Sequence, residues 1–132
     1  MGPTEQVHYS SNNHDIEVII GKKTFKVEVK SDFFAKRSGN LAIEFHNSKS
    51  DKPSGINSTK ADWWVHYFLD ELYITKVKTL KKFCKENKPL KTIIAGGNKN
   101  ANLWIYKIPD ILKIFTKIDE ENIKKVCKLM SK

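Results

Sequence analysis

HDIEVIIGKKTFKVEVKSD, residues 14–32, predicts a β-hairpin that the rest of the chain supports. Residues 16–20 are mostly β-branched, which is typical of a strand, and residues 21–23 (GKK) form the expected tight turn. Residues 24–30 alternate polar side chains with apolar ones. We therefore expect one face of the second strand to be buried and the other to be charged.

Three polar groups of this hairpin are predicted to lie together at one edge. Asp15 stands at the entrance to the first strand, and Glu28 and Lys30 are two residues apart in the second. Side chains two residues apart project from the same face of a strand. The alternative is that Lys26, Glu28 and Lys30 form only a solvated row with a weak ion pair, since charged alternating strands are common.

The residue types in this cluster suit phosphodiester hydrolysis. The unaided reaction is extremely slow, so an enzyme must stabilise the developing charge and activate a water molecule. Mg²⁺ or Mn²⁺ supplies both, and Asp15, Glu28 and the Val29 carbonyl could act as its oxygen ligands. Lys30 could orient or deprotonate the attacking water, or stabilise the charge on the phosphorane.

The charge of the chain points to a polyanionic partner. Its 132 residues, which we expect to form a single domain with a short N-terminal arm over residues 1–14, carry a formal net charge of +9. Arg37 is the only arginine, and lysine contacts phosphate as a point charge, whereas bidentate arginine commonly reads guanine. We therefore expect DNA to be recognised through its backbone or shape. A lysine-rich surface that only confers solubility is the alternative.

The remaining sequence predicts an α/β fold with a mixed central sheet and flanking helices. Further strands are expected at Leu41–Phe45, Leu72–Thr75 and Leu103–Ile108. Helices are expected at Val77–Asn87, from Pro109 onward, and after the acidic run 119–121 as far as Met130. Another helix, capped by Ser58 or Thr59, is predicted to run through the aromatic stretch 63–68.

The stretch from Asp15 to Lys30 resembles the core of the PD-(D/E)XK nuclease superfamily, which includes restriction endonucleases and archaeal-type Holliday junction resolvases. The motif of that family is an acid, a hairpin and then E-x-K. The resemblance implies a restriction-endonuclease-like α-β-β-β-α-β core, metal ligands at Asp15 and Glu28, and a catalytic lysine at Lys30. The family usually adds an N-terminal helix, often with a glutamate at the metal, and Glu5 could take that place. His14 stands where many members have proline.

Several other polar residues are candidates for the site or for contacts with DNA. The loop 46–57 either grips phosphates, with Gly55 allowing close approach of the backbone, or is a simple surface loop. Glu44 is either an accessory metal carboxylate or an exposed strand-end residue, and Asp62 fits a helix cap better than a site residue. The predicted nucleic-acid-binding residues are Lys36, Arg37, Lys49, Lys52, Ser54 and Lys60.

These patterns predict a metal-dependent DNA endonuclease directed by structure or backbone, with junction resolution as a reasonable subclass. One such site cuts one strand, so cleavage of both strands would call for a homodimer. A catalytically inactive nucleic-acid-binding module on the same scaffold is the alternative. No stretch is apolar enough to span a membrane, and Cys84 and Cys127 are expected to be reduced core residues. We therefore expect an intracellular protein, either cytoplasmic or associated with nucleic acid.

Overall fold

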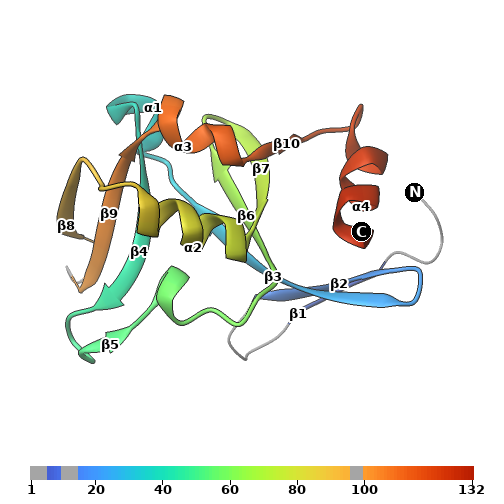
Figure 1. Ribbon diagram of the computed structural model, residues 1–132, viewed down its shortest axis with the longest axis horizontal. Helices are drawn as coiled ribbons and strands as arrows, with labels where there is room; N and C mark the ends of the chain where they lie inside the picture. The colour runs from blue at the N-terminus through green and yellow to red at the C-terminus, as the bar shows by residue number, and fades with distance from the viewer. Residues whose placement is uncertain (1–5, 10–14, 96–99) are drawn as a thin grey trace.

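Two β-sheets form the framework of the molecule, and the computed structural model describes residues 6–9, 15–95 and 100–132 (Figure 1). The larger sheet has six strands in the order β1-β2-β3-β6-β7-β10. β3 and β6 run parallel, and the other neighbouring pairs are antiparallel. Its strands are β1 (Gln6–Tyr9), β2 (Ile16–Ile20), β3 (Lys23–Ser31), β6 (Trp63–Phe68), β7 (Glu71–Lys76) and β10 (Thr116–Ile118).

The smaller sheet has four antiparallel strands in the order β5-β4-β9-β8. The pairing of β4 with β9 is interrupted by an irregularity between Glu44 and His46. Phe45, which lies at this irregularity, stacks on Trp104 with the ring centroids 4.3 Å apart. The strands are β4 (Asn40–Asn47), β5 (Lys52–Pro53), β8 (Lys91–Ala95) and β9 (Ala101–Lys107).

Helices connect the strands and cover the two sheets. Figure 1 shows α2 (Val77–Glu86) between the sheets and the viewer, and α4 (Ile123–Ser131) near the β2–β3 hairpin. Both helices are amphipathic, since each buries a few apolar residues and exposes its lysines. The shorter elements are α1 (Ala35–Ser38), α3 (Ile108–Ile111) and the 3₁₀ turns η1 (Gly55–Asn57) and η2 (Leu112–Ile114). No helix among the described residues is long and apolar enough to cross a membrane.

Buried apolar residues form two clusters, and β6 contributes to both. Trp64 and Phe68 belong to the main cluster, with residues of β4, η1, α2 and α3. Trp63 belongs to the smaller cluster, where Val126 and Met130 of α4 also pack. Successive side chains of a strand point to opposite faces, so the adjacent tryptophans face different clusters. The larger sheet is therefore covered on both faces along β6.

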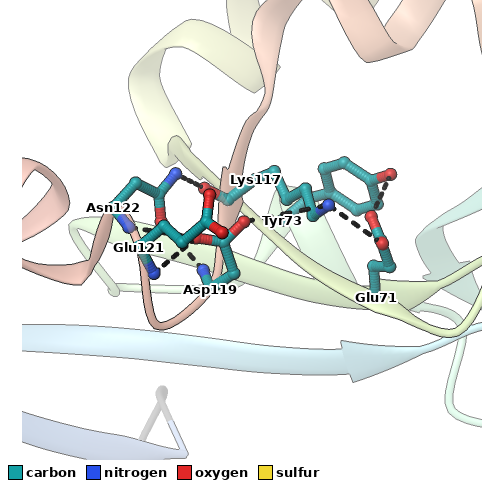
Figure 2. Close-up of polar contacts among 6 residues, drawn as sticks. All are labelled: Glu71, Tyr73, Lys117, Asp119, Glu121 and Asn122. Atoms are coloured by element: carbon teal, nitrogen blue, oxygen red, sulfur yellow. Dashed lines mark hydrogen bonds and ion pairs between the residues drawn. The ribbon is translucent and has the colours of Figure 1, made fainter.

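Ion pairs and hydrogen bonds fix the start of α4 at the edge of the larger sheet. Lys117 Nζ lies 3.0 Å from a carboxylate oxygen of Glu71 and 3.8 Å from one of Asp119 (Figure 2). The Asp119 carboxylate in turn accepts hydrogen bonds of 3.0 Å from the backbone N–H groups of Glu121 and Asn122 (Figure 2). The acidic run 119–121 thus precedes α4, as the sequence predicts.

The predicted hairpin, the later strands and the long helices are confirmed, but the helix predicted over residues 63–68 is wrong. This segment is strand β6, which pairs in parallel with β3 and antiparallel with β7. A strand buried on both faces reads as a continuous apolar run, which lacks the alternation that marks a half-buried strand. Asp62 caps no helix; its carboxylate accepts a 3.1 Å hydrogen bond from the Lys26 N–H, and its own N–H donates to the Lys26 carbonyl.

Two further expectations need correction. The predicted arm 1–14 contains strand β1, which adds to the edge of the larger sheet beside β2. The predicted strand Leu41–Phe45 belongs to the smaller, separate sheet, because β4 pairs with β5 and β9 rather than with the hairpin. The α/β class and the mixed sheet are confirmed, with an antiparallel sheet added. Cys84 and Cys127 are reduced, half-buried cysteines. Glu5 and His14 lie outside the described residues.

Candidate active site

The register of the hairpin brings Asp15 and Glu28 face to face. β2 and β3 pair Ile16 with Val27, so Asp15, one residue earlier, stands across from Glu28, one residue later. The Asp15 carboxylate accepts a 2.7 Å hydrogen bond from the Val29 N–H, and its own N–H donates to the Val27 carbonyl at 3.1 Å. These bonds hold the carboxylate beside β3, within hydrogen-bonding reach of the Glu28 carboxyl group.

Glu28 is buried and has a partner at each oxygen. Its exposed fraction is 8%. The Thr59 hydroxyl donates a 2.8 Å hydrogen bond to Oε1, and Lys30 Nζ lies 3.5 Å from Oε2. Thr59 is brought there by the chain that follows η1 and precedes β6. Asp15, Glu28 and Lys30, which the sequence predicts to be neighbours, are therefore together at one place.

The environment of Glu28 favours its protonated form. Burial is the main cause that raises the pKa of Glu28 above its ordinary value of 4.5, and the nearby Asp15 carboxylate adds to this rise. The Thr59 hydrogen bond and the Lys30 charge lower the pKa again, but they do not cancel the rise. Two ionised carboxylates that face each other in a partly buried site repel each other, and a shared proton or a bound cation would relieve this repulsion.

Strand β6, which runs parallel to β3, adds a tryptophan and a buried histidine to the site. Pairing of β3 with β6 sets Trp64 beside Glu28, and His66 beside Lys30. Trp64 Nε1 donates a 3.0 Å hydrogen bond to Nδ1 of His66, so the remaining ring nitrogen carries the proton. Lys30 Nζ lies 5.9 Å from the centre of the Trp64 ring, within the range of a cation–π contact.

His66 is neutral at this site. It is 2% exposed, and burial, helped by the charge of Lys30, lowers the pKa of His66 to about 3. Because this imidazole is neutral, the positive charge beside Glu28 comes from Lys30 and not from His66. The sequence did not identify Thr59 or His66 as residues of this site. Thr59 belongs to no site motif and is predicted only as a helix cap. His66 would have been placed beside Lys30 if residues 63–68 had been interpreted as a strand.

Asp15 and Glu28 are the two carboxylates of this cluster that could hold a metal ion. Within the described part of the chain, no group of three or more His, Cys, Asp or Glu side chains could hold one. Mg²⁺ usually takes one or two carboxylates, keeps several waters and binds substrate phosphate, so the predicted role of Asp15 and Glu28 needs no third side chain, and it stays a prediction. Val29 lies between Glu28 and Lys30 in β3, and its carbonyl as a third ligand stays a prediction. Glu44 is not part of this pair; it lines a cavity with Lys30 and His66.

The residues predicted to contact DNA are scattered around the molecule. Lys36 and Arg37 are exposed on α1, where Lys36 Nζ pairs with Asp70 at 2.7 Å. Lys49, Lys52 and Lys60 are exposed. The Ser54 hydroxyl is buried and has no hydrogen-bond partner among the described residues, so it does not face outward to grip a phosphate.

Gly55 allows a close approach between two segments of the protein's own backbone. It has a positive φ of 54°, and a side chain there would overlap the Glu44 carbonyl group. The close approach predicted for this glycine therefore exists, but its partner is β4.

Comparison of the chain with protein-family models, with curated proteins and with solved structures gives no match.

Proposed function

We propose that the chain is a metal-dependent DNA endonuclease on a restriction-endonuclease-like scaffold, with its active site at Asp15, Glu28 and Lys30. The observation that carries the proposal is the convergence of these three groups. A buried carboxylate, a second carboxylate within hydrogen-bonding reach and a lysine at 3.5 Å share one face of the β2–β3 hairpin. A buried carboxyl group with a raised pKa beside a second carboxylate and a lysine is typical of catalytic sites.

The roles of the residues follow from their positions. Asp15, Glu28 and the Val29 carbonyl would hold Mg²⁺ or Mn²⁺, which would polarise the phosphate and activate a water molecule. Thr59 fixes one oxygen of Glu28 and leaves the other facing Lys30. The Lys30 ammonium, one-third exposed, can reach a phosphate placed at the pair and stabilise the charge that develops on its oxygens.

The charge of the molecule supports DNA as the substrate, read by backbone or structure. The net charge is +9 and comes almost wholly from lysines, which bind phosphates as point charges. One site of this size cuts one strand. Cleavage of both strands, as in junction resolution, would need two copies, so a homodimer belongs to this proposal.

Metal-dependent cleavage by wild type and by a lysine variant tests the proposal. Plasmid, single-stranded and four-way-junction DNA are incubated with Mg²⁺, Mn²⁺ or EDTA. We expect nicking that needs the metal and that falls at least about 100-fold in Lys30→Ala, because a positioned acid–base or charge-stabilising group contributes that much.

Lys26→Ala is the matched control. Lys26 lies in the same strand and on the same face, and its side chain is exposed. Its removal should leave cleavage within about twofold of wild type, since a single exposed charge contributes little. Equal loss in both variants would mean that the effect is one of overall charge, and would contradict the role given to Lys30.

The burial of Glu28 favours one alternative, a nucleic-acid-binding module without catalysis. Burial raises the pKa of Glu28, and a carboxyl group that keeps its proton does not ligate a metal. In that case the same substrates are bound in a salt-dependent way, but none is cut in Mg²⁺ or in Mn²⁺.

A further inference from the structure

A mainly apolar cavity lies next to the candidate active site. Its volume is about 420 Å³, within the range of sites that hold small organic ligands. Lys30 and His66 line it from the larger sheet, and residues of β4, β8 and β9 line it from the smaller one. Its apolar walls include Phe33, Phe34, Trp64, Ile93, Leu103 and Ile105.

Two phenylalanines stand exposed on the rim of this cavity. Phe33 is 77% exposed and Phe34 is 73% exposed, which are the highest values among the large apolar residues described. A phenyl ring left in water forgoes about 2 kcal/mol of burial energy, so a neighbouring pair of them is a costly feature. Exposed apolar groups beside a concave site mark a surface that a partner covers.

The backbone under these two rings is firmly held. The Asp32 carboxylate accepts hydrogen bonds of 3.0 Å from the N–H groups of Phe34, Ala35 and Ala42. The Asp32 N–H donates a 2.8 Å bond to the Tyr67 carbonyl, which ties the segment to β6. The rings are therefore presented to solvent by a fixed turn, and they need little ordering when a ligand arrives.

The chemistry of the surroundings favours a nucleotide. Lys30 belongs both to the candidate active site and to the cavity wall, so a phosphate at Lys30 places its neighbouring base at the mouth of the cavity. Lys36 and Arg37 lie two and three residues after Phe34 and are exposed, and Lys36 pairs with Asp70 at 2.7 Å. The net charge of +9 attracts a polyanion to this surface.

We propose that this cavity takes an unpaired nucleobase of the strand that is cut, with Phe33 and Phe34 stacking on it. The inference rests on the proposed function for the identity of its ligand, DNA, and it narrows the substrate to strands with unpaired bases. A base inside a duplex is stacked between its neighbours and cannot enter a cavity without being turned out. Single strands, flaps and branch points offer such a base at no cost.

Binding without metal tests this inference separately from cleavage. The affinity for a short oligothymidylate is measured by fluorescence anisotropy in EDTA and low salt. The same measurement is made with an abasic strand of equal length and with a duplex. We expect wild type to prefer oligothymidylate to the abasic strand about tenfold, since stacking of one base on an aromatic side chain contributes about 1–3 kcal/mol.

Variants at the rim identify the surface. Phe33→Ala and Phe34→Ala should each lower the affinity for oligothymidylate about 3- to 10-fold and leave the affinity for the abasic strand unchanged. Leu129→Ala is the control, because Leu129 is an exposed apolar residue on α4, outside the cavity lining. It should change neither affinity.

Three results would overturn the inference. One is equal affinity of wild type for the strands with and without bases, and another is equal loss on both strands in the phenylalanine variants. The third is a dimer, seen by sedimentation, that dissociates in Phe33→Ala while DNA binding persists; the rims would then cover each other. If base-dependent binding is found but Mg²⁺ gives no cleavage, the proposed function fails and the base site stands. If cleavage is found without base preference, the reverse holds.

Discussion

At the scale of single residues, Glu28 is placed where an ionised carboxylate is unfavourable. It is buried, it faces Asp15, and within the described part of the chain its charge is compensated by Lys30 and Thr59. A fold selected for stability alone would not keep this arrangement, since a neutral residue of the same shape would avoid the cost. Local conflicts of this kind are expected where a protein binds or reacts.

Replacing Glu28 with glutamine should therefore stabilise the protein. The raised pKa means that folded Glu28 holds its proton more tightly than unfolded Glu28, so its contribution to stability falls as pH rises through the folded pKa. Glutamine is neutral and still accepts the Thr59 hydrogen bond. At pH 7 and in EDTA we expect Glu28→Gln to raise the free energy of unfolding by about 1 kcal/mol, and the melting temperature by a few degrees.

The pH dependence separates this effect from a change in packing. The gain should shrink as the pH falls through the folded pKa of Glu28 and vanish below 4.5, its ordinary pKa, because the carboxyl group is then neutral in both states. Glu86→Gln, at an exposed position on α2, should change the melting temperature little at any pH. A destabilised Glu28→Gln protein at pH 7 would contradict the account of this site. Mg²⁺ should protect wild type more than the variant.

At the scale of elements, Thr59 reaches Glu28 because η1 is packed against β4. Gly55 begins η1 with its backbone directly against the Glu44 carbonyl group, and Ile56 is fully buried beside it. The Thr59 N–H donates to the Gly55 carbonyl at 3.0 Å, so the glycine fixes the position of the threonine. A side chain at residue 55 would push η1 away from β4 and move Thr59 from the site.

Substitutions at two glycines separate the energetic cost of steric overlap from the cost of a left-handed backbone conformation. Gly55 and Gly21 both have positive φ, of 54° and 62°, but a side chain at Gly21 would meet nothing within 4 Å. Gly21→Ala should cost only the left-handed strain, about 1–2 kcal/mol. Gly55→Ala should cost that strain plus the overlap with β4, about 3 kcal/mol or more, as measured by urea unfolding. Similar losses in both proteins would show that the contact with β4 relaxes easily.

Local patterns made part of this fold predictable, and non-local pairing made the rest unpredictable. The hairpin and α2 follow from periodicities within a few residues, so Asp15, Glu28 and Lys30 could be placed together. Strand β6 is apolar on both faces and neighbours β3 only through a parallel crossover, which periodicity does not show. The contact of Thr59 with Glu28 spans 31 residues of chain and depends on that crossover.

At the scale of the whole molecule, five lysines line a second hollow, which we call the lysine groove. It has a volume of about 660 Å³ and is lined by Trp63 and Met130 of the smaller apolar cluster and by residues at the start of α2. The candidate active site lies apart from it, beside Trp64. Its lysines are Lys23, Lys76, Lys78, Lys81 and Lys132, with Asp62 as the acidic residue among them.

If the chain binds DNA as proposed, this groove would extend the binding surface beyond the candidate active site. Phosphates held by lysine release their counterions, so each contact contributes about 0.7–0.9 to the slope of log affinity against log salt concentration. Lys78 and Lys81 are exposed on α2 at the groove, and they do not touch the candidate active site. They are therefore suited to test whether binding extends that far.

Charge reversal at the groove should weaken binding and flatten its dependence on salt. We expect Lys78→Glu/Lys81→Glu to reduce the slope for duplex or branched DNA by about 1–2, as measured by anisotropy titrations at several salt concentrations. The matched control is Lys113→Glu/Lys124→Glu, which changes the net charge equally at exposed lysines outside the groove. If the control flattens the slope as much, the whole surface attracts DNA and no defined path exists. If only the groove variant does, the DNA-binding surface extends from Lys30 to the lysine groove beside α2.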